Sequence, residues 1–161
     1  MNYRKVSASA RQAQQRLAVT SRFRLRVRRS AIHGLGVFAG QAIPPRVKVI
    51  EYGGERISRR ETRRRFLRIL KDHRGTFNYL ARLNSYWTID GRVGGTGAEL
   101  VNHSCEPNVG PRREHGRLWF VSLRRIRKGE ELVADYKFPR RGLRTPCHCG
   151  AASCRGTINR H

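Results

Sequence analysis

The sequence predicts an α+β domain that consists predominantly of short β-strands, with one main helix. Three observations support this fold class. Apolar and polar residues alternate in several short segments, which is the pattern of half-buried strands. Glycines and prolines separate these segments at close intervals, as in turns between strands. With 161 residues, the chain is long enough to form one domain with a substantial hydrophobic core.

Residues 1–21 are expected to form a basic tail that is disordered or loosely helical. This segment is polar and rich in Gln, Ala and Arg, and its apolar residues show little periodicity. An acid-free, Arg-rich N-terminus is also typical of an organelle transit peptide. No apolar signal-peptide core precedes the domain, so an oxidising compartment is not indicated. No apolar run is long enough to predict a membrane span.

The strands are expected in short alternating or apolar segments that end at turn residues. The segment 31–40 is expected to be a turn that leads into a short strand, and Gly53 and Gly54 end the strand before them. The predicted strands lie at residues 23–27, within 31–40, and at 47–52, 78–83, 86–89, 118–123 and 131–134.

Residues 58–71 predict the main helix. Ser58 followed three residues later by Glu61 matches a capping box, in which each side chain bonds a free backbone N–H of the first turn. An apolar stripe on this helix would contain Phe66, Ile69 and Leu70.

The chain is strongly basic, with a formal net charge of +24 from 35 basic and 11 acidic residues. Thirty of the basic residues are Arg, which suits phosphate or carboxylate recognition and is equally expected from a GC-rich genome. Residues 1–50 contain no acid, and residues 56–74 contain nine basic residues. Such a surface attracts nucleic acid through counterion release, although a solvated, solubilising surface has the same composition.

The acidic residues are concentrated in one part of the chain. We expect this cluster to lie beside the functional pocket and to attract a basic substrate. Six of the eleven acids fall here: Glu99, Glu106, Glu114, Glu130, Glu131 and Asp135.

The four cysteines predict one tetrahedral Zn²⁺ site. Cys147, Cys149 and Cys154 form a C-x-C-x4-C cluster, and Cys105 lies about forty residues upstream, so four thiols match one site with none left over. Two disulfides would allow three pairings, and a bridge between Cys147 and Cys149 would be strained. Four unrelated thiols are the remaining alternative. A shared zinc site would bring the end of the chain back onto the segment that contains Cys105.

The motifs, taken in order, resemble those of SET-domain lysine methyltransferases with a post-SET zinc element. The resemblance covers residues 33–159, and the C-terminal motifs are most similar to the trithorax/mixed-lineage-leukaemia branch. It implies a SET (β-clip) fold with a pseudoknot, divided into a tail (1–21), a SET domain (22–138) and a post-SET segment (139–161). The motifs that carry it are HGLGVF at 33–38, IEYGG at 50–54, NHSCEPN at 102–108, GEEL at 129–132, DYKFP at 135–139 and the closing cysteines.

The resemblance also implies an activity, which is transfer of a methyl group from S-adenosyl-L-methionine (SAM) to a protein lysine. Methyl transfer is an in-line displacement, so the protein mainly orients two reactants. Tyr136 and Tyr79 correspond to catalytic tyrosines, and the zinc ligands would be Cys105, Cys147, Cys149 and Cys154. Gly34 and Gly36 would let the backbone approach the cofactor. The implied cofactor-binding residues are His33, Gly34, Leu35, Gly36, Tyr79, Asn102, His103, Tyr136 and His148.

Two positions depart from the pattern of this family. Ala134 stands two residues before Tyr136, where relatives usually carry Phe or Tyr, and the smaller side chain leaves room for di- or trimethylation. Glu99 stands three residues before Asn102, where close relatives commonly carry a basic residue.

The resemblance implies a substrate and a setting. The substrate would be a basic protein, either a histone or a histone-like, nucleoid-associated protein, and the Arg-rich surface would contact DNA non-specifically. Without a Cys-rich pre-SET region, the chain resembles a minimal stand-alone SET protein of the bacterial cytoplasm or nucleoid, or an effector that reaches a host nucleus. The alternative is a non-catalytic SET module that binds nucleic acid or protein, and methyl-transfer assays distinguish the two.

Overall fold

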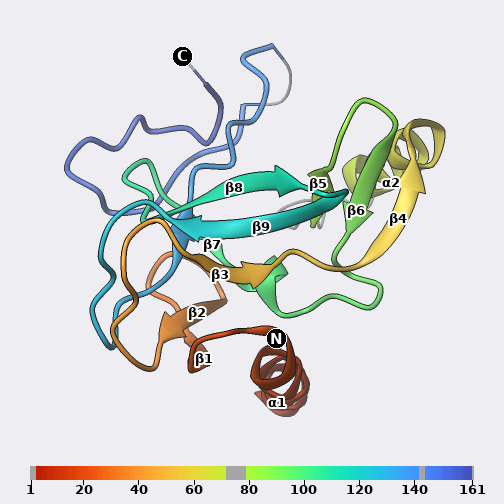
Figure 1. Cartoon of the computed structure of the whole chain (residues 1–161). Helices are drawn as coiled ribbons and strands as arrows, with labels where there is room; N and C mark the ends of the chain where they lie inside the picture. The colour runs from red at the N-terminus through yellow and green to blue at the C-terminus, as the bar shows by residue number, and fades with distance from the viewer. Residues whose placement is uncertain (1–2, 72–78, 142–143, 161) are drawn as a thin grey trace.

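The computed structural model describes residues 3–71, 79–141 and 144–160 and confirms the predicted, predominantly β fold class (Figure 1). In chain order the elements are α1 (Tyr3–Thr20), β1 (Leu25–Arg29), β2 (Leu35–Ala39), β3 (Lys48–Glu51), β4 (Glu55–Ser58), α2 (Arg59–Lys71), β5 (Leu80–Arg82), β6 (Trp87–Asp90), the short 3-10 helix η1 (Ala98–Leu100), β7 (Asn102–His103), β8 (Val109–Glu114), β9 (Arg117–Ser122) and β10 (Val133–Ala134).

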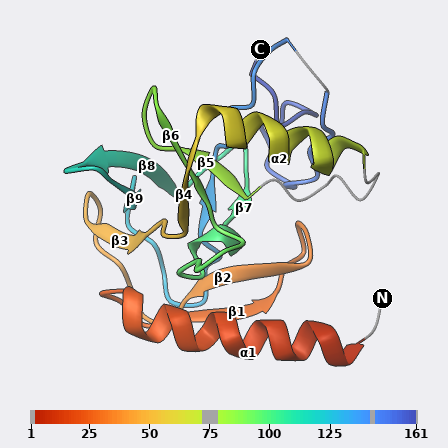
Figure 2. The same ribbon diagram turned by 90° about the vertical axis from the view of Figure 1, so that its right-hand side faces the viewer.

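The described strands form three small sheets. The first is the antiparallel pair β1–β2, the second has the order β3-β9-β8-β10-β7, and the third has the order β4-β6-β5. Figure 2 shows α1 running along β1 and β2 at one end of the molecule, while α2 covers the β4-β6-β5 sheet at the other end. The candidate site residues lie between these ends, where β7 and β10 meet.

The strand β10 passes between two strands that follow each other in the chain. It pairs in parallel with β7 on one side and with β8 on the other, although only residues 104–108 connect β7 to β8. The ends of this connection bond to β10: Ser104 N–H donates to the Ala134 carbonyl (3.1 Å), and Asn108 N–H donates to the Val133 carbonyl (3.0 Å). The side chain of Asn108 also accepts the N–H of Val133 (2.9 Å). The connection therefore encloses β10, which is the threaded arrangement expected of a pseudoknot.

The hydrophobic core lies between the sheets and contains side chains from most of the elements. Tyr52 and Phe120 meet edge to face there, with ring centroids 5.9 Å apart. Burying these apolar side chains is the main stabilising contribution to the fold. The fully enclosed members include Leu17, Val37, Ile43, Ile50, Val109, Ile126 and Leu132.

The N-terminal segment differs from the expected disordered or loosely helical tail, because residues 3–20 form the helix α1. Ala13 and Leu17, four residues apart, lie on the same face of this helix and are 1% and 0% exposed. The side chain of Gln14 accepts the N–H of Val27 (2.8 Å) and donates to the carbonyl of Leu25 (2.9 Å). Arg16 also pairs with Glu99 (2.9 Å), so polar contacts share in docking α1. Two buried apolar side chains are too few to produce a clear sequence period.

The predicted main helix is present as α2, but it packs differently from the expectation. Ser58 accepts the N–H of Glu61 (3.3 Å), whereas the Glu61 carboxylate bonds to Arg64 and Arg65, so only half of the capping box forms. None of its residues is buried, and Phe66 and Leu67 are 39% and 47% exposed. The apolar stripe therefore contributes little to the core.

Each predicted strand overlaps an observed one, and three further strands, β4, β7 and β8, were not predicted. Asn78, the first residue of one predicted strand, lies outside the described residues. β8 contains Pro111 and several charged residues, which are unfavourable inside a sheet. They are tolerated because β10 pairs with β8 only at Val109, which leaves the rest of that side of β8 an edge. No helix in the described part of the chain is long and apolar enough to cross a membrane.

Candidate active site and metal centre

Asn102 joins the predicted cofactor loop to the threaded part of the fold. Its side-chain amide donates to the carbonyls of His33 (3.2 Å) and Leu35 (3.1 Å) and to the carboxylate of Glu131 (2.8 Å). Asn102 is buried and lies on β7, next to β10. The amide thus fixes the backbone of the 33–35 turn relative to the centre of the fold.

Glu131 supports the same turn through the side chain of Ser30. Ser30 donates its hydroxyl to Glu131 (2.9 Å) and accepts the N–H of Ile32 (3.0 Å). A side chain at Gly36 would overlap the Glu131 carboxyl group and lie 3.1 Å from the Cβ of Ser30. Gly34 has a φ of 49°, a conformation that favours glycine. The structure therefore explains both glycines by packing and backbone conformation, and their contact with a cofactor stays a prediction.

His103 orients the backbone of Tyr136. The Nδ1 atom of His103 accepts the N–H of Tyr136 (3.1 Å), so this nitrogen carries no proton. Burial lowers the pKa of His103, which outweighs the opposite effect of Asp135 and keeps the ring neutral. The proton therefore resides on Nε2, which lies 3.6 Å from the sulfur of Cys105. One imidazole thus links the residue of the predicted transfer site to a predicted metal ligand.

The hydroxyl group of Tyr136 has a fixed partner. It donates to the carbonyl of Val101 (2.7 Å), and the residue as a whole is 38% exposed. Burial raises the pKa of Tyr136 well above its usual value, and Tyr79 and Glu131 raise it further. Tyr136 is therefore a neutral phenol at neutral pH, and its bond to Val101 fixes the orientation of its ring and of its hydroxyl dipole.

Tyr52, which was not among the predicted site residues, positions Tyr79. The Tyr52 hydroxyl donates to the Tyr79 carbonyl (2.8 Å), which also accepts the N–H of Gly91 (3.0 Å). Burial raises the pKa of both tyrosines. Tyr136 and Tyr79 also raise the pKa of Tyr52, and Tyr79 raises that of Tyr136, as expected of phenols that lie near one another. The only sequence signal for Tyr52 was its place within the IEYGG motif.

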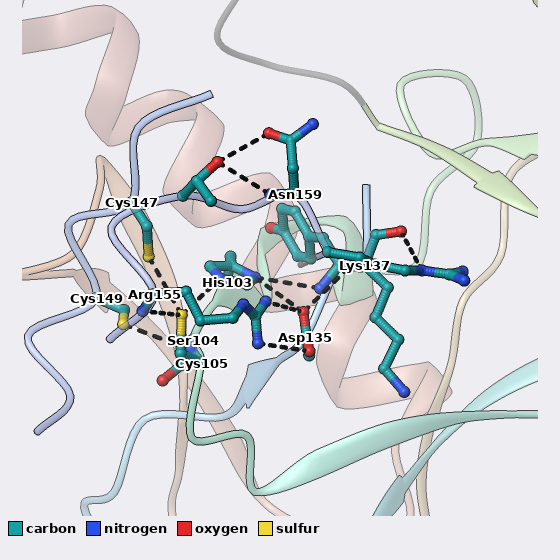
Figure 3. Close-up of polar contacts among 12 residues, drawn as sticks. His103, Ser104, Cys105, Asp135, Lys137, Cys147, Cys149, Arg155 and Asn159 are labelled. Carbon is teal, nitrogen blue, oxygen red and sulfur yellow. Dashed lines mark hydrogen bonds and ion pairs between the residues drawn. The ribbon is translucent and has the colours of Figure 1, made fainter. Parts of the chain in front are cut away.

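The four cysteines come together as predicted, with their sulfur atoms all within 4.8 Å of one another. The sulfurs of Cys105 and Cys147 are 3.8 Å apart (Figure 3). A tetrahedral site with Zn–S bonds of about 2.3 Å has sulfur–sulfur edges of about 3.8 Å, which is this separation. The cysteines of the loop after β7 and of the C-terminal segment are therefore close enough together to hold one zinc ion.

The surroundings of the sulfurs suit thiolates that share a divalent cation. Backbone N–H groups point at them: Cys105 N–H donates to Cys149 (3.5 Å) and Arg155 N–H donates to Cys105 (3.4 Å). Although burial opposes ionisation, N–H donors from Cys105 and Ala151 and the adjacent thiols lower the pKa of Cys149 to about 6. Burial raises the pKa of Cys147 and Cys105. Four thiols this close repel one another when ionised, so a dication is the group that fits them.

Asp135 and Arg155 connect the C-terminal segment to the residue before Tyr136. Arg155 binds Asp135 through two nitrogens, at 3.1 and 2.8 Å. Burial opposes ionisation of Asp135, but its bonds to Arg155 and to the N–H of Lys137 hold its pKa below the usual value. The pair borders an open surface hollow of about 390 Å³ that is also lined by Lys137 and Arg160.

The six acids of residues 99–135, which were expected to attract a basic substrate, are bonded within the protein. Each has a bonded partner within the protein, so their charges hold segments of the chain together. The distribution of charge along the sequence could not reveal this, because most of the partners are distant in sequence. The pairs are Glu99–Arg16, Glu106–Ser153, Glu114–Lys48, Glu130–Arg124, Glu131–Asn102 and Asp135–Arg155.

The remaining predicted site residues lie around this centre. His33 is exposed, and its carbonyl accepts the side-chain amide of Asn102. His148 is exposed and lies between two of the clustered cysteines in the sequence. Glu99, which departs from the family pattern, pairs with Arg16 of α1 at 2.9 Å. Ala134 is buried on β10, opposite His103. The supporting roles of Glu131, Asp135 and Arg155 were not predicted from the sequence.

A threaded strand beside an Asn-His segment, with a cysteine centre that His103 links to Tyr136, defines a domain of the SET class. The sequence matches the SET domain family over residues 34–137, which confirms the resemblance. The chain belongs to the SET-domain family.

Several curated histone-lysine N-methyltransferases are similar to this chain. Histone-lysine N-methyltransferase 2B of Homo sapiens is 40% identical over 89% of the chain and 5% of its own length. Trithorax of Drosophila virilis is 38% identical over 81% of the chain and 4% of its own length. The H3 lysine-4 specific enzyme of Saccharomyces cerevisiae is 40% identical over 81% of the chain and 13% of its own length. The chain thus matches only a small part of each relative.

Proposed function

We propose that this protein is a SAM-dependent protein-lysine N-methyltransferase whose substrate is a histone or a histone-like, nucleoid-associated protein. Membership of the SET-domain family and the names of its relatives support the reaction. The observation that carries the proposal is a bonded series of residues. It runs from the His33 turn through Asn102 on β7 to the adjacent His103 and on to Tyr136.

The cofactor side of the proposed site is formed by residues that already hold one another in place. Bound SAM supplies the methyl group to be transferred, on a sulfonium. Fixed backbone at the 33–36 turn and at β7 would keep that group in one orientation, which is the main contribution a protein can make to an in-line displacement. The proposed cofactor contacts are His33, Gly34, Leu35, Gly36, Tyr79, Asn102, His103, Tyr136 and His148.

The amine side would be formed by the phenols of Tyr52, Tyr79 and Tyr136. A lysine side chain has a reference pKa of about 10.4 and must lose its proton before it attacks. Phenols with the ordinary pKa of about 10 are already neutral at neutral pH, and burial raises the pKa values of these three further, so they offer no anion that would stabilise the ammonium form. A dry, uncharged channel lowers the pKa of the amine by desolvation. Tyr136 and Tyr79 are therefore the proposed catalytic residues.

We propose one structural Zn²⁺ held by Cys105, Cys147, Cys149 and Cys154. Four thiolates complete a tetrahedral shell, which leaves no open position for substrate. Because Cys105 follows the segment with Asn102 and His103, the centre would attach the C-terminal segment to the site. Its contribution is thus the assembly of one wall of the active site.

Methyl transfer from labelled SAM to a histone or a histone-like protein tests the reaction. Tyr136→Phe removes the hydroxyl that bonds Val101, and we expect kcat to fall about tenfold or more. Tyr86→Phe is the matched control, because Tyr86 is 75% exposed, and it should retain wild-type activity. Absence of transfer by the wild type, with binding of nucleic acid or protein retained, would instead establish the non-catalytic module.

The buried position of Ala134 suggests a second property, the degree of methylation. A methyl side chain between His103 and Val109 leaves more space near Tyr136 than an aromatic ring would. We expect mass spectrometry to detect di- or trimethyllysine with the wild type and mainly monomethyllysine with Ala134→Phe. Only monomethyl product from the wild type would contradict this proposal.

We also propose that α2 contacts DNA non-specifically. Arg60, Arg63 and Arg68 are exposed, and the structure gives them no acidic partner among the described residues. Replacing all three with Gln should reduce the slope of log K against log salt by about 2 to 3. An unchanged slope would exclude this surface. Such contacts would keep the protein at the nucleoid in a bacterial cytoplasm, or at host chromatin for a secreted effector.

A further inference from the structure

Arg155 contacts both the cysteine centre and the strand end that holds Tyr136. It directly follows Cys154, and its backbone N–H donates to the sulfur of Cys105 (3.4 Å). Its guanidinium group binds Asp135 through two nitrogens (3.1 and 2.8 Å). Figure 3 shows this side chain extending from the cysteines to Asp135. Arg155 therefore connects the cysteine centre, through its backbone, to Asp135, through its guanidinium group.

Asp135 in turn bonds to the backbone next to Tyr136. Its Oδ1 atom accepts the N–H of Lys137 (3.1 Å) and also the guanidinium of Arg155. The N–H of Tyr136 itself is held by His103, whose ring lies 3.7 Å from the same carboxylate. Two successive amides of the transfer site are thus fixed by side chains that contact one another.

The ion pair is positioned to be stronger than a surface contact. The side chains of Arg155 and Asp135 are 18% and 14% exposed. A bidentate Arg–carboxylate pair with little solvent access fixes orientation as well as distance, whereas exposed pairs contribute little. Loss of either partner would leave the other partly buried without its counter-charge.

We propose that Arg155 is a positioning residue that couples the four-cysteine centre to Tyr136. When the centre is loaded, the backbone of Arg155 is fixed beside Cys105, and its guanidinium then holds Asp135 and the Tyr136–Lys137 backbone. The effect on methyl transfer rests on the proposed function, but the coupling itself does not. It is a property of this chain that can be measured without a methyl acceptor.

Amide hydrogen exchange of the zinc-loaded full chain tests the coupling directly. In Arg155→Gln, the amides of Tyr136 and Lys137 should exchange at least about tenfold faster, while zinc content stays at the wild-type value. The matched control is Arg144→Gln, because Arg144 is an exposed arginine of the same segment. It should change neither quantity. Zinc-free wild-type protein should show the same increase as Arg155→Gln.

Partner variants separate coupling from general destabilisation. Asp135→Asn should accelerate the same two amides, and the double variant with Arg155→Gln should add little, because both changes break one connection. Arg155→Lys should give an intermediate result, since lysine keeps the charge without the bidentate geometry. In an active enzyme, Arg155→Gln should reduce kcat several-fold more than it changes the KM for SAM.

The outcomes are distinguishable. Unchanged exchange at Tyr136 and Lys137 in zinc-loaded Arg155→Gln would overturn the coupling, and so would loss of zinc from that variant, which would make Arg155 a support of the metal centre alone. A wild type that shows the exchange effect but transfers no methyl group would overturn the proposed function and leave the coupling intact.

Discussion

Leu17→Ala measures how firmly α1 belongs to the domain. Leu17 is fully buried, and a Cβ at Gly97 would lie 2.7 Å from its side chain, so the contact is close. The substitution removes three carbon atoms, worth about 2.4 kcal/mol at about 0.8 kcal/mol each. The remaining cavity raises the expected loss to about 2.5–4 kcal/mol. This is a large part of the stability of a typical domain, about 5–15 kcal/mol.

Urea unfolding of the full chain gives the difference in free energy, provided that the slope with denaturant is unchanged. Val19→Ala is the control on the same helix, because Val19 is 87% exposed, and its effect should stay within about 0.5 kcal/mol. If Leu17→Ala unfolded at the same urea concentration as Val19→Ala, α1 would not be packed, and the sequence-based expectation of a loose tail would hold instead.

Two further substitutions test the support of the site and the charge network of α2. Gly36→Ala should destabilise the protein by about 1–3 kcal/mol in urea unfolding, because its Cβ overlaps Glu131, and no loss would contradict that packing. The bonds from Arg64 and Arg65 lower the pKa of Glu61 from 4.5 to about 2. A lowered pKa in the folded state gives stability that is present above the unfolded pKa and is lost as the pH falls. The difference in Tm between wild type and Glu61→Gln should therefore be complete at pH 7 and disappear between about pH 4.5 and 2, and a difference that grew on acidification would contradict the assignment.

The sequence was sufficient to predict elements whose pattern is local. The predicted strands overlap observed ones because alternation within five or six residues records which face is buried. Residues 58–71 were predicted correctly as a helix. The packing of this helix was not predicted, because an apolar stripe that contains Phe66 does not show which part of the protein packs against it. The segment of α1 was expected to be a disordered or loosely helical tail because, among its residues whose burial the structure describes, only Ala13 and Leu17 are buried. β8 was missed because Pro111 is unfavourable in a strand unless one side is unpaired.

The residues of the candidate site also fall into those that the sequence could predict and those that it could not. The cysteine cluster was predictable because thiols are few and zinc needs four. The HGLG and NHSC motifs pointed to the residues that meet at β7 and β10. The supporting contacts of Tyr52, Glu131 and Arg155 were not predictable, because each depends on partners far away in sequence. The partners of the acids of residues 99–135 were likewise not predictable, because most of them are distant in sequence.

The most direct test of the central claim is to measure zinc content, SAM affinity and methyl transfer on one preparation, before and after chelation. We predict one zinc per chain, loss of both SAM affinity and transfer when the metal is removed, and recovery when zinc is restored. The contradicting result would be a protein without zinc that binds SAM and transfers methyl groups as well as before, because the cysteine centre would then have no part in assembling the site.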